Sequence, residues 1–127
     1  MMPVVVDANV LIDVLRGRRA AHMAIRQVRR QRGELVSPAT TRSEVLAGLK
    51  PGEERATEAV FRLIEWVPVS SEIADVAGAY ARQYKPAYSG IDLSDYLLAA
   101  TADVLGGRLL TLNVRHFPMF PDLEPAY

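Results

Sequence analysis

The chain has 127 residues, half of them hydrophobic, and we expect residues 1–127 to form a single domain with a buried core. It has no cysteine, which excludes disulfides, thiolate zinc sites and a cysteine nucleophile, and its formal net charge of zero does not favour general attraction to nucleic acid. No apolar run reaches the roughly 18 residues of a membrane span, and no signal-like segment begins the chain. We therefore expect a cytoplasmic protein that does not contact the membrane.

Short apolar strands alternate with helices along the chain. Apolar and β-branched runs bounded by turn residues predict the strands, and apolar residues at helical spacing predict the helices. The predicted strands are residues 4–7, 34–37, 67–69 and 109–112. The predicted helices are residues 8–16, 20–31, 41–49, 53–65, 72–84 and 93–105. This order predicts an α/β fold with a parallel sheet covered by helices on both faces.

Three acidic residues fall where such a sheet presents its chemistry, at strand ends and helix starts. Asp7 ends the first predicted strand, and Glu44 lies in the first turn of the helix after the second strand. Asp95 lies in the first turn of the helix at 93–105, with Asp92 three residues before it. Each acid also has a purely structural interpretation as a helix cap or, for Glu44, as the last residue of a capping box at 41–44, worth about 1 kcal/mol.

Considered together, the three acids predict a role beyond helix capping. Helix starts along one edge of a parallel sheet can lie close together, and clustered carboxylates oppose each other's ionisation. A hard divalent cation such as Mg²⁺ or Mn²⁺ removes that conflict, whereas the two histidines, His22 and His116, have no zinc-binding spacing. A cation held by carboxylates can activate water for attack on a phosphodiester. The residues therefore indicate a metal-dependent phosphodiesterase, most simply a nuclease.

The segment 16–32 contains arginines but no acidic residue. Seven arginines fall in it, namely Arg16, Arg18, Arg19, Arg26, Arg29, Arg30 and Arg32. Two interpretations stay open: a solvated helix face, or a one-signed surface that positions a nucleic-acid backbone.

Three blocks in this order resemble a PIN-domain ribonuclease, and more narrowly the VapC toxins of toxin–antitoxin pairs. The blocks are VVVDANVLIDVLRG, SPATTRSEVLAGL and DYLLAATADVLGGRLLTLNVRHF. The resemblance implies a three-layer sandwich whose central parallel sheet has four or five strands. It also implies an endoribonuclease that depends on Mg²⁺ or Mn²⁺, is inhibited by a cognate VapB-like antitoxin and forms a homodimer.

The resemblance also assigns roles to individual residues. Asp7, Glu44 and Asp95 match the family's first three acids, which would bind the metal and carry catalysis. The fourth acidic position holds Asn113, which keeps an oxygen ligand and loses the charge. The predicted mechanism, rather than the resemblance, gives Arg16, Arg18 and Arg19 the role of guiding the RNA backbone, and contact with an acidic antitoxin is the alternative role.

Several neighbouring residues have two interpretations at this stage. Thr111 either hydrogen-bonds an acid or a metal-bound water, or is an ordinary hydroxyl at a strand end. Asp92 either adds charge near Asp95 or caps its helix, and Ser37 either braces the acids or ends its strand. His116 either touches substrate or packs beside Phe117.

Two rival functions are also considered. In a non-catalytic PIN-like module the acids would only cap helices, and the domain would bind RNA or a protein. A phosphoacceptor receiver domain has a similar size and class, but Asp7 is followed by Ala8 and Asn9 rather than by another acid.

Overall fold

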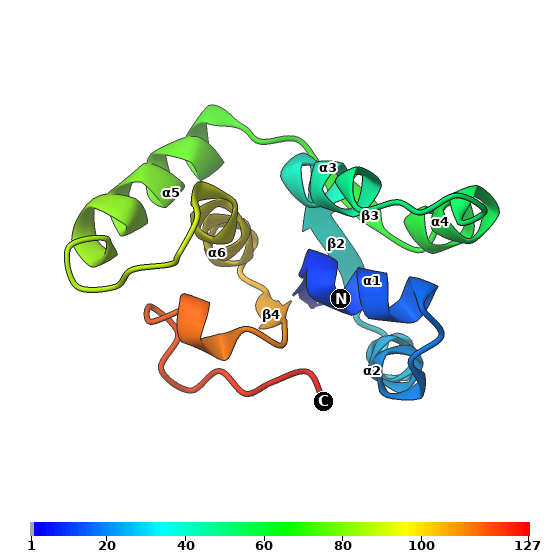
Figure 1. The fold of residues 1–127 in the computed structure, drawn as a ribbon. Helices are drawn as coiled ribbons and strands as arrows, with labels where there is room; N and C mark the ends of the chain where they lie inside the picture. Colours follow the sequence, from blue (N-terminus) through cyan, green and yellow to red (C-terminus); the bar gives the residue numbers. More distant parts are fainter. Residues whose placement is uncertain (1) are drawn as a thin grey trace.

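A computed structural model of the chain describes residues 2–127. Its centre is one four-stranded sheet with the strand order β3-β2-β1-β4 (Figure 1). The strands are β1 (Pro3–Val6), β2 (Glu34–Pro38), β3 (Glu65–Val67) and β4 (Arg108–Leu110). Every neighbouring pair is parallel, so the carboxyl ends of all four strands lie at one edge of the sheet. The predicted α/β fold with a parallel sheet is confirmed.

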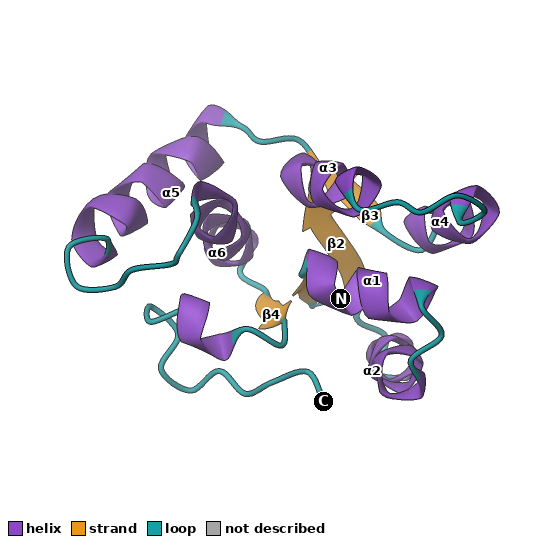
Figure 2. Cartoon of the chain, in the orientation of Figure 1, coloured by secondary structure: helices purple, strands orange, loops and turns teal. Residues whose placement is uncertain are grey.

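Helices cover both faces of this sheet (Figure 2). Helices α1 (Ala8–Leu15), α2 (Arg19–Arg30) and α4 (Glu54–Phe61) pack on one face. Helix α6 (Leu93–Leu105) packs on the other face, and α5 (Ser71–Tyr84) packs on the far side of α6. Helix α3 (Ala39–Ala47) contacts both α1 and α6, and a short 3₁₀ helix, η1 (Val114–His116), follows β4. The starts of α1, α3 and α6 thus meet near the carboxyl edge of the sheet.

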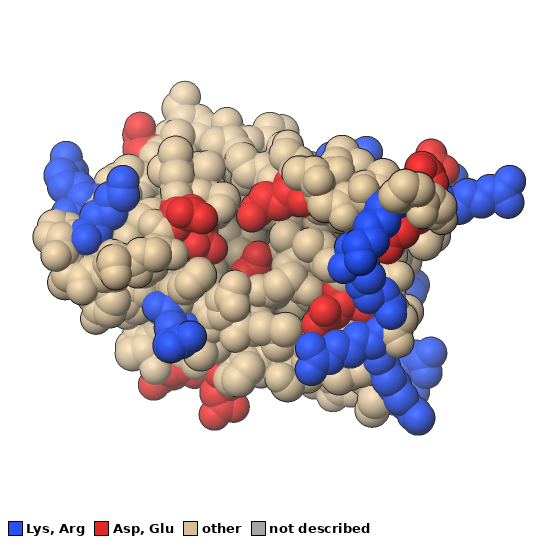
Figure 3. Space-filling model, viewed as in Figure 1, with Lys and Arg blue, Asp and Glu red and all other residues tan. Residues whose placement is uncertain are grey.

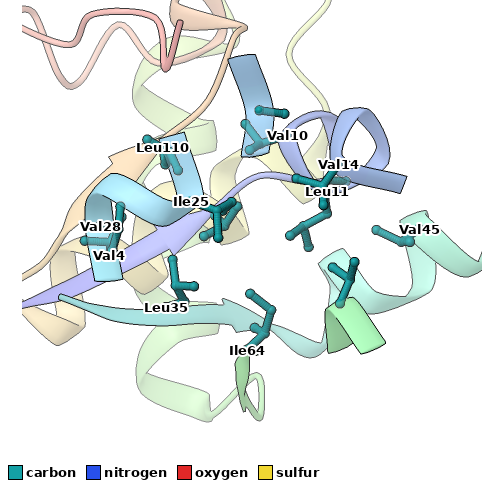
Figure 4. Close-up of a cluster of buried hydrophobic side chains, with 14 of the residues drawn as sticks. Val4, Val10, Leu11, Val14, Ile25, Val28, Leu35, Val45, Ile64 and Leu110 are labelled. Atoms are coloured by element: carbon teal, nitrogen blue, oxygen red, sulfur yellow. The ribbon is translucent and has the colours of Figure 1, made fainter. Parts of the chain in front are cut away.

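Strand β1 shows how the core is divided between the two faces. Val4 and Val6 point into the cluster formed with α1, α2 and α4, part of which is drawn in Figure 4. Val5 points the other way, into the cluster formed with α6. Each of these three side chains is almost completely buried, and burying one valine contributes roughly 1.5–3 kcal/mol. The fully apolar run of β1 is therefore the signature of a strand covered on both faces.

Several predicted elements have different bounds in the structure: the helix predicted at 53–65 is α4 (Glu54–Phe61), and the strand predicted at 109–112 is β4 (Arg108–Leu110). Helix α3 begins at Ala39, directly after β2, so Glu44 lies in its second turn rather than its first. The predicted capping box at 41–44 is therefore wrong, because Thr41 is a buried residue inside the helix. Strand β3 lies two residues earlier than predicted, since Pro68 has no N–H with which to extend the ladder.

The end of α6 at Leu105 follows the prediction. Gly106 ends α6 in the left-handed conformation, with φ of 64°, which favours glycine. Gly107 then passes so close to β1 that a Cβ atom at this position would collide with the carbonyl oxygen of Pro3. Among residues 2–127, no helix is both long and apolar enough to cross a membrane.

Candidate active site

Asp7 lies at the centre of the carboxyl edge of the sheet. It follows β1, and its backbone N–H donates to the carbonyl of Leu110 in β4 at 2.9 Å. Its residue is only 7 % exposed, yet its carboxylate accepts hydrogen bonds from Thr111 Oγ1 at 2.7 Å and from Asn9 Nδ2 at 3.4 Å. Although Asp7 is the N-cap residue of α1, its side chain makes no capping hydrogen bond. The carboxylate is therefore committed to the sheet edge rather than to the helix.

The loop after β4 is built around this carboxylate. Thr111 is fully buried, and its hydroxyl accepts the backbone N–H of Asn113 at 3.0 Å while donating to Asp7. Asn9 also contacts the loop, because its Oδ1 accepts the backbone N–H of Leu112 at 3.4 Å. A hydroxyl that accepts one bond has its hydrogen directed at the other partner. Thr111 and Asn9 therefore fix both the position of Asp7 and the path of the loop that carries Asn113.

Asp95 lies in the first turn of α6. Its Oδ2 accepts the backbone N–H of Asp92 at 3.0 Å, and Asp92 is the N-cap residue of the helix. The same oxygen lies 3.2 Å from His116 Nδ1, although the contact does not have the geometry of a hydrogen bond. The expected helix cap at Asp92 is confirmed. His116 thus contacts an acid of the site and does not only pack beside Phe117.

Glu44 extends from α3 toward the same region. Desolvation of its carboxyl group, followed by the negative charges of Asp7 and Asp95, raises the pKa of Glu44 to about 7. Burial likewise raises the pKa of Asp7, and the charge of Asp95 adds to this rise, while the Thr111 hydrogen bond opposes it. Burial also raises the pKa of Asp95, against the Asp92 N–H and the His116 ring, which lower it. Asp7, Glu44 and Asp95 are thus close enough to oppose one another's ionisation.

Acidic side chains border a hollow on the surface. Figure 3 shows acidic side chains around a depression at the centre of the face, between α1, α3 and α6. Within residues 2–127, no three Asp, Glu or His side chains form a ready-made ligand cage. Mg²⁺ usually keeps several waters and binds through one or two carboxylates, so it does not need such a cage. The oxygen donors and their mutual repulsion therefore fit a hydrated Mg²⁺ or Mn²⁺ ion.

Some arginines of segment 16–32 form ion pairs, although the segment itself contains no acidic residue. Arg16 Nε lies 3.1 Å from Glu53 Oε2, and Arg18 Nη1 lies 3.1 Å from Asp13 Oδ2. Both pairs involve acids from outside the segment, which a charge count within 16–32 cannot include. Arg19 is exposed at the start of α2 and has no ion pair among the described residues. On the face in Figure 3 the basic side chains gather over α2 and α4, beside the central hollow.

Three residues of the site have contacts that the sequence alone did not settle. Ser37 donates to the carbonyl of Val6 at 2.7 Å, so it ties β2 to the residue that precedes Asp7. Asn9 was missed, although an amide two residues after an acid at a helix start was the available signal. Asn113 is exposed, and its backbone rather than its side chain contacts the site.

The model of the PIN domain matches residues 4–120. The chain belongs to the PIN-domain family. It is 43% identical over 122 residues to Ribonuclease VapC19 of Mycobacterium tuberculosis, covering 96% of this chain and 98% of that protein. It is 38% identical over 124 residues to Ribonuclease VapC10 of the same species, covering 98% and 92%.

Solved structures agree with this assignment. A toxin-antitoxin complex from Klebsiella pneumoniae contains a chain with a TM-score of 0.80 and 27% identity, and the match covers 98% of both chains. VapBC-1 from nontypeable Haemophilus influenzae gives a TM-score of 0.79 at 23% identity, again over 98% of both chains, which shows a shared fold. The resemblance of this chain to PIN-domain proteins of the VapC type is thus confirmed.

Proposed function

We propose that this PIN-domain protein is a metal-dependent endoribonuclease and the toxin of a VapBC-like toxin–antitoxin pair. The observation that carries the proposal is the meeting of Asp7, Glu44 and Asp95 at the carboxyl edge of the sheet, where the charge of Asp95 raises the pKa of both Asp7 and Glu44, and the charge of Asp7 raises that of Glu44. The relatives of this chain that are named VapC ribonucleases support RNA as the substrate. We also propose that residues 1–127 form a single domain, as the chain length predicts.

The residues of the hollow have distinct roles in this proposal. Asp7, Glu44 and Asp95 would hold Mg²⁺ or Mn²⁺, directly or through waters. A bound divalent ion supplies positive charge next to a phosphodiester and makes water a better nucleophile near neutral pH. Thr111 keeps the Asp7 carboxylate in one orientation, and Asn113 would add an oxygen donor without adding charge. Asp92 acts mainly through the amide that it presents to Asp95.

The partners follow from the same reasoning. Chains of similar fold occur in toxin–antitoxin complexes, which supports a VapB-like antitoxin as the protein partner. An antitoxin could inhibit this site by placing a basic side chain among the three acids, since opposite charges favour one another there. Arg16, Arg18 and Arg19 would guide the RNA backbone toward the hollow. A homodimer, as the resemblance implies, completes the proposed assembly.

The direct test is cleavage of labelled RNA by the Asp7→Asn variant. Loss of the negative charge should abolish cleavage in Mg²⁺ or Mn²⁺, as should a chelator added to the wild-type protein. Asp75→Asn is a matched control, because Asp75 is an exposed acid on α5. A thermal melt establishes that both variants are folded. Full cleavage by Asp7→Asn from a nuclease-free preparation would contradict the proposal.

The rival function is a non-catalytic PIN-like module that binds RNA or a protein. Asn113, which lacks the charge of an acid at the fourth position, is the observation that favours it. Such a module would bind Mn²⁺ no better than the Asp7→Asn variant does. A calorimetric titration with Mn²⁺ therefore separates the two functions, because the nuclease must lose Mn²⁺ affinity with that substitution.

A further inference from the structure

A pocket of about 760 Å³ opens beside the acid-lined hollow. It lies between the loop after α5 and the segment that contains η1. Its lining includes Tyr88, Ser89, Arg115, His116 and Phe120. Its volume falls within the roughly 300–1,000 Å³ that is usual for small-ligand sites. The pocket therefore has room for part of a nucleotide.

His116 joins this pocket to the hollow. Its ring lines the pocket, and its Nδ1 lies 3.2 Å from the Asp95 carboxylate. A chain whose phosphate lies at the three acids would thus place a neighbouring nucleotide beside His116. The position of the pocket, next to the reacting group rather than remote from it, is the first reason to connect it with substrate.

Tyr88 provides a supported aromatic surface in the pocket. Its residue is 44% exposed, so the side chain is accessible to a ligand in the pocket. Its ring packs edge-on against Tyr84 with centroids 6.0 Å apart, and its backbone N–H donates to the Tyr84 carbonyl at 2.9 Å. The ring is therefore held in place while much of its surface faces solvent, which is the arrangement that a stacked base needs.

Arg115 gives the pocket the charge of a phosphate-binding site. It is exposed on η1 and has no ion pair among the residues that the structure describes. Figure 3 shows basic atoms over η1, at the edge of the face that also carries the acid-lined hollow. A cation next to an aromatic ring suits the two parts of a nucleotide, its phosphate and its base.

We infer that this pocket binds the unpaired base of the nucleotide next to the scissile phosphate, with Tyr88 stacking on the base and Arg115 contacting a backbone phosphate. The inference rests on the proposed function, because it takes the acid-lined hollow as the place of cleavage. It adds a binding subsite to that function, and it predicts that the base in the pocket must be free of pairing, since a paired base cannot reach the tyrosine ring.

The test measures the binding of short single-stranded RNA by fluorescence anisotropy, using the full chain with Asp7→Asn to prevent cleavage. Tyr88→Ala should weaken binding about tenfold, as expected for the loss of one base–aromatic stack, and Tyr88→Phe should not. Arg115→Ala should lower the dependence of the affinity on salt by about one phosphate contact, and Arg82→Ala, an exposed arginine of α5, should not.

The deciding measurement combines Tyr88→Ala with RNA that contains one abasic residue, moved along the oligonucleotide. At one position of the abasic residue, the loss of affinity caused by Tyr88→Ala and the loss caused by the missing base should not add, because both changes remove the same stack. Equal losses from Tyr88→Ala with every abasic oligonucleotide, or no loss at all, would overturn the inference. Cleavage by the wild-type chain is scored separately. RNA cleavage without this coupling rejects only the subsite, and coupling without cleavage rejects only the nuclease.

Discussion

Thr111 donates its hydroxyl hydrogen to the carboxylate of Asp7 across 2.7 Å, although 104 positions separate the two residues in the sequence. The bond joins the loop after β4 to the end of β1, and both residues are buried. Because the same hydroxyl accepts a hydrogen bond from the backbone N–H of Asn113, the hydroxyl hydrogen is directed at Asp7. The most buried acid of the site is therefore oriented by a neutral neighbour.

Thr111→Val should destabilise the protein and slow RNA cleavage. Valine has nearly the same shape but cannot donate, so the buried carboxylate loses its shortest hydrogen bond, at a cost of roughly 1–3 kcal/mol. Loss of the donor also raises the pKa of Asp7 further, because this bond is what opposes the effect of burial. Urea unfolding and initial cleavage rates measure the two effects. Thr111→Ser keeps the hydroxyl and should stay near the wild type, and a valine variant equal to the serine variant would be evidence against this role.

The metal-free protein should lose stability as the pH rises from mildly acidic to neutral. The pKa of Glu44 is raised from 4.5 to about 7, so the folded chain retains a proton that the unfolded chain has released. Between those two values the folded state binds more protons, and the free energy of unfolding falls with increasing pH. The raised pKa values of Asp7 and Asp95 act in the same direction.

Urea unfolding in the presence of a chelator, at about pH 5 and at about pH 7.5, measures this slope. Glu44→Gln should make the slope shallower, because its side chain does not titrate. Added Mg²⁺ should restore stability mainly at the higher pH, where the carboxylates are ionised and can bind it. Stability that rises with pH in this range would contradict the proposed repulsion among the acids.

Arg19→Ala should weaken RNA binding more than Arg18→Ala. Arg18 is already paired with Asp13, whereas Arg19 has no ion pair among residues 2–127. Removing a free arginine that contacts a phosphate should lower the slope of log affinity against log salt by about one. Binding measured at several salt concentrations gives this slope. Identical slopes for Arg19→Ala and the wild type would remove Arg19 from the RNA path.

Two glycines should respond to alanine in opposite ways. At Gly107 a Cβ would collide with the carbonyl oxygen of Pro3, so Gly107→Ala should force β4 away from β1 and cost roughly 1–3 kcal/mol. At Gly78, inside α5, a Cβ would meet nothing within 4 Å, so Gly78→Ala should stabilise the helix by about 0.5–1 kcal/mol. Chemical unfolding of both variants measures the difference, and a neutral Gly107→Ala would show that the two strands can separate without cost.

The alternation of strands and helices could be predicted from the sequence because the apolar pattern is strong. The fully apolar run of β1 and the left-handed Gly106 both have the structure that their residues favour. The start of α3 was placed too late, because Thr41 has the side chain of a cap but is packed inside the molecule. Tertiary burial therefore outweighed local capping preference at that position.

The site could be predicted in part. Parallel strands bring their carboxyl ends to one edge, so the gathering of Asp7, Glu44 and Asp95 near one another follows from topology, while their roles as ligands stay a prediction. The contacts of Asn9 and His116 depend on how two loops fold over that edge, which no periodicity encodes. The pairing of Arg16 and Arg18 was hidden for the same reason, since neither partner is visible within their own segment.

The pairing of β1 with β4 has a consequence for the cell that makes this protein. Val6 at the end of β1 pairs in register with Leu110 of β4, so the carboxylate of Asp7 gains its threonine neighbour only when the chain extends to residue 111. A nascent chain still attached to the ribosome, or a truncated product of interrupted synthesis, lacks this half of the centre. In the proposed nuclease, RNA cleavage would therefore become possible only after β4 has been synthesised and has paired with β1.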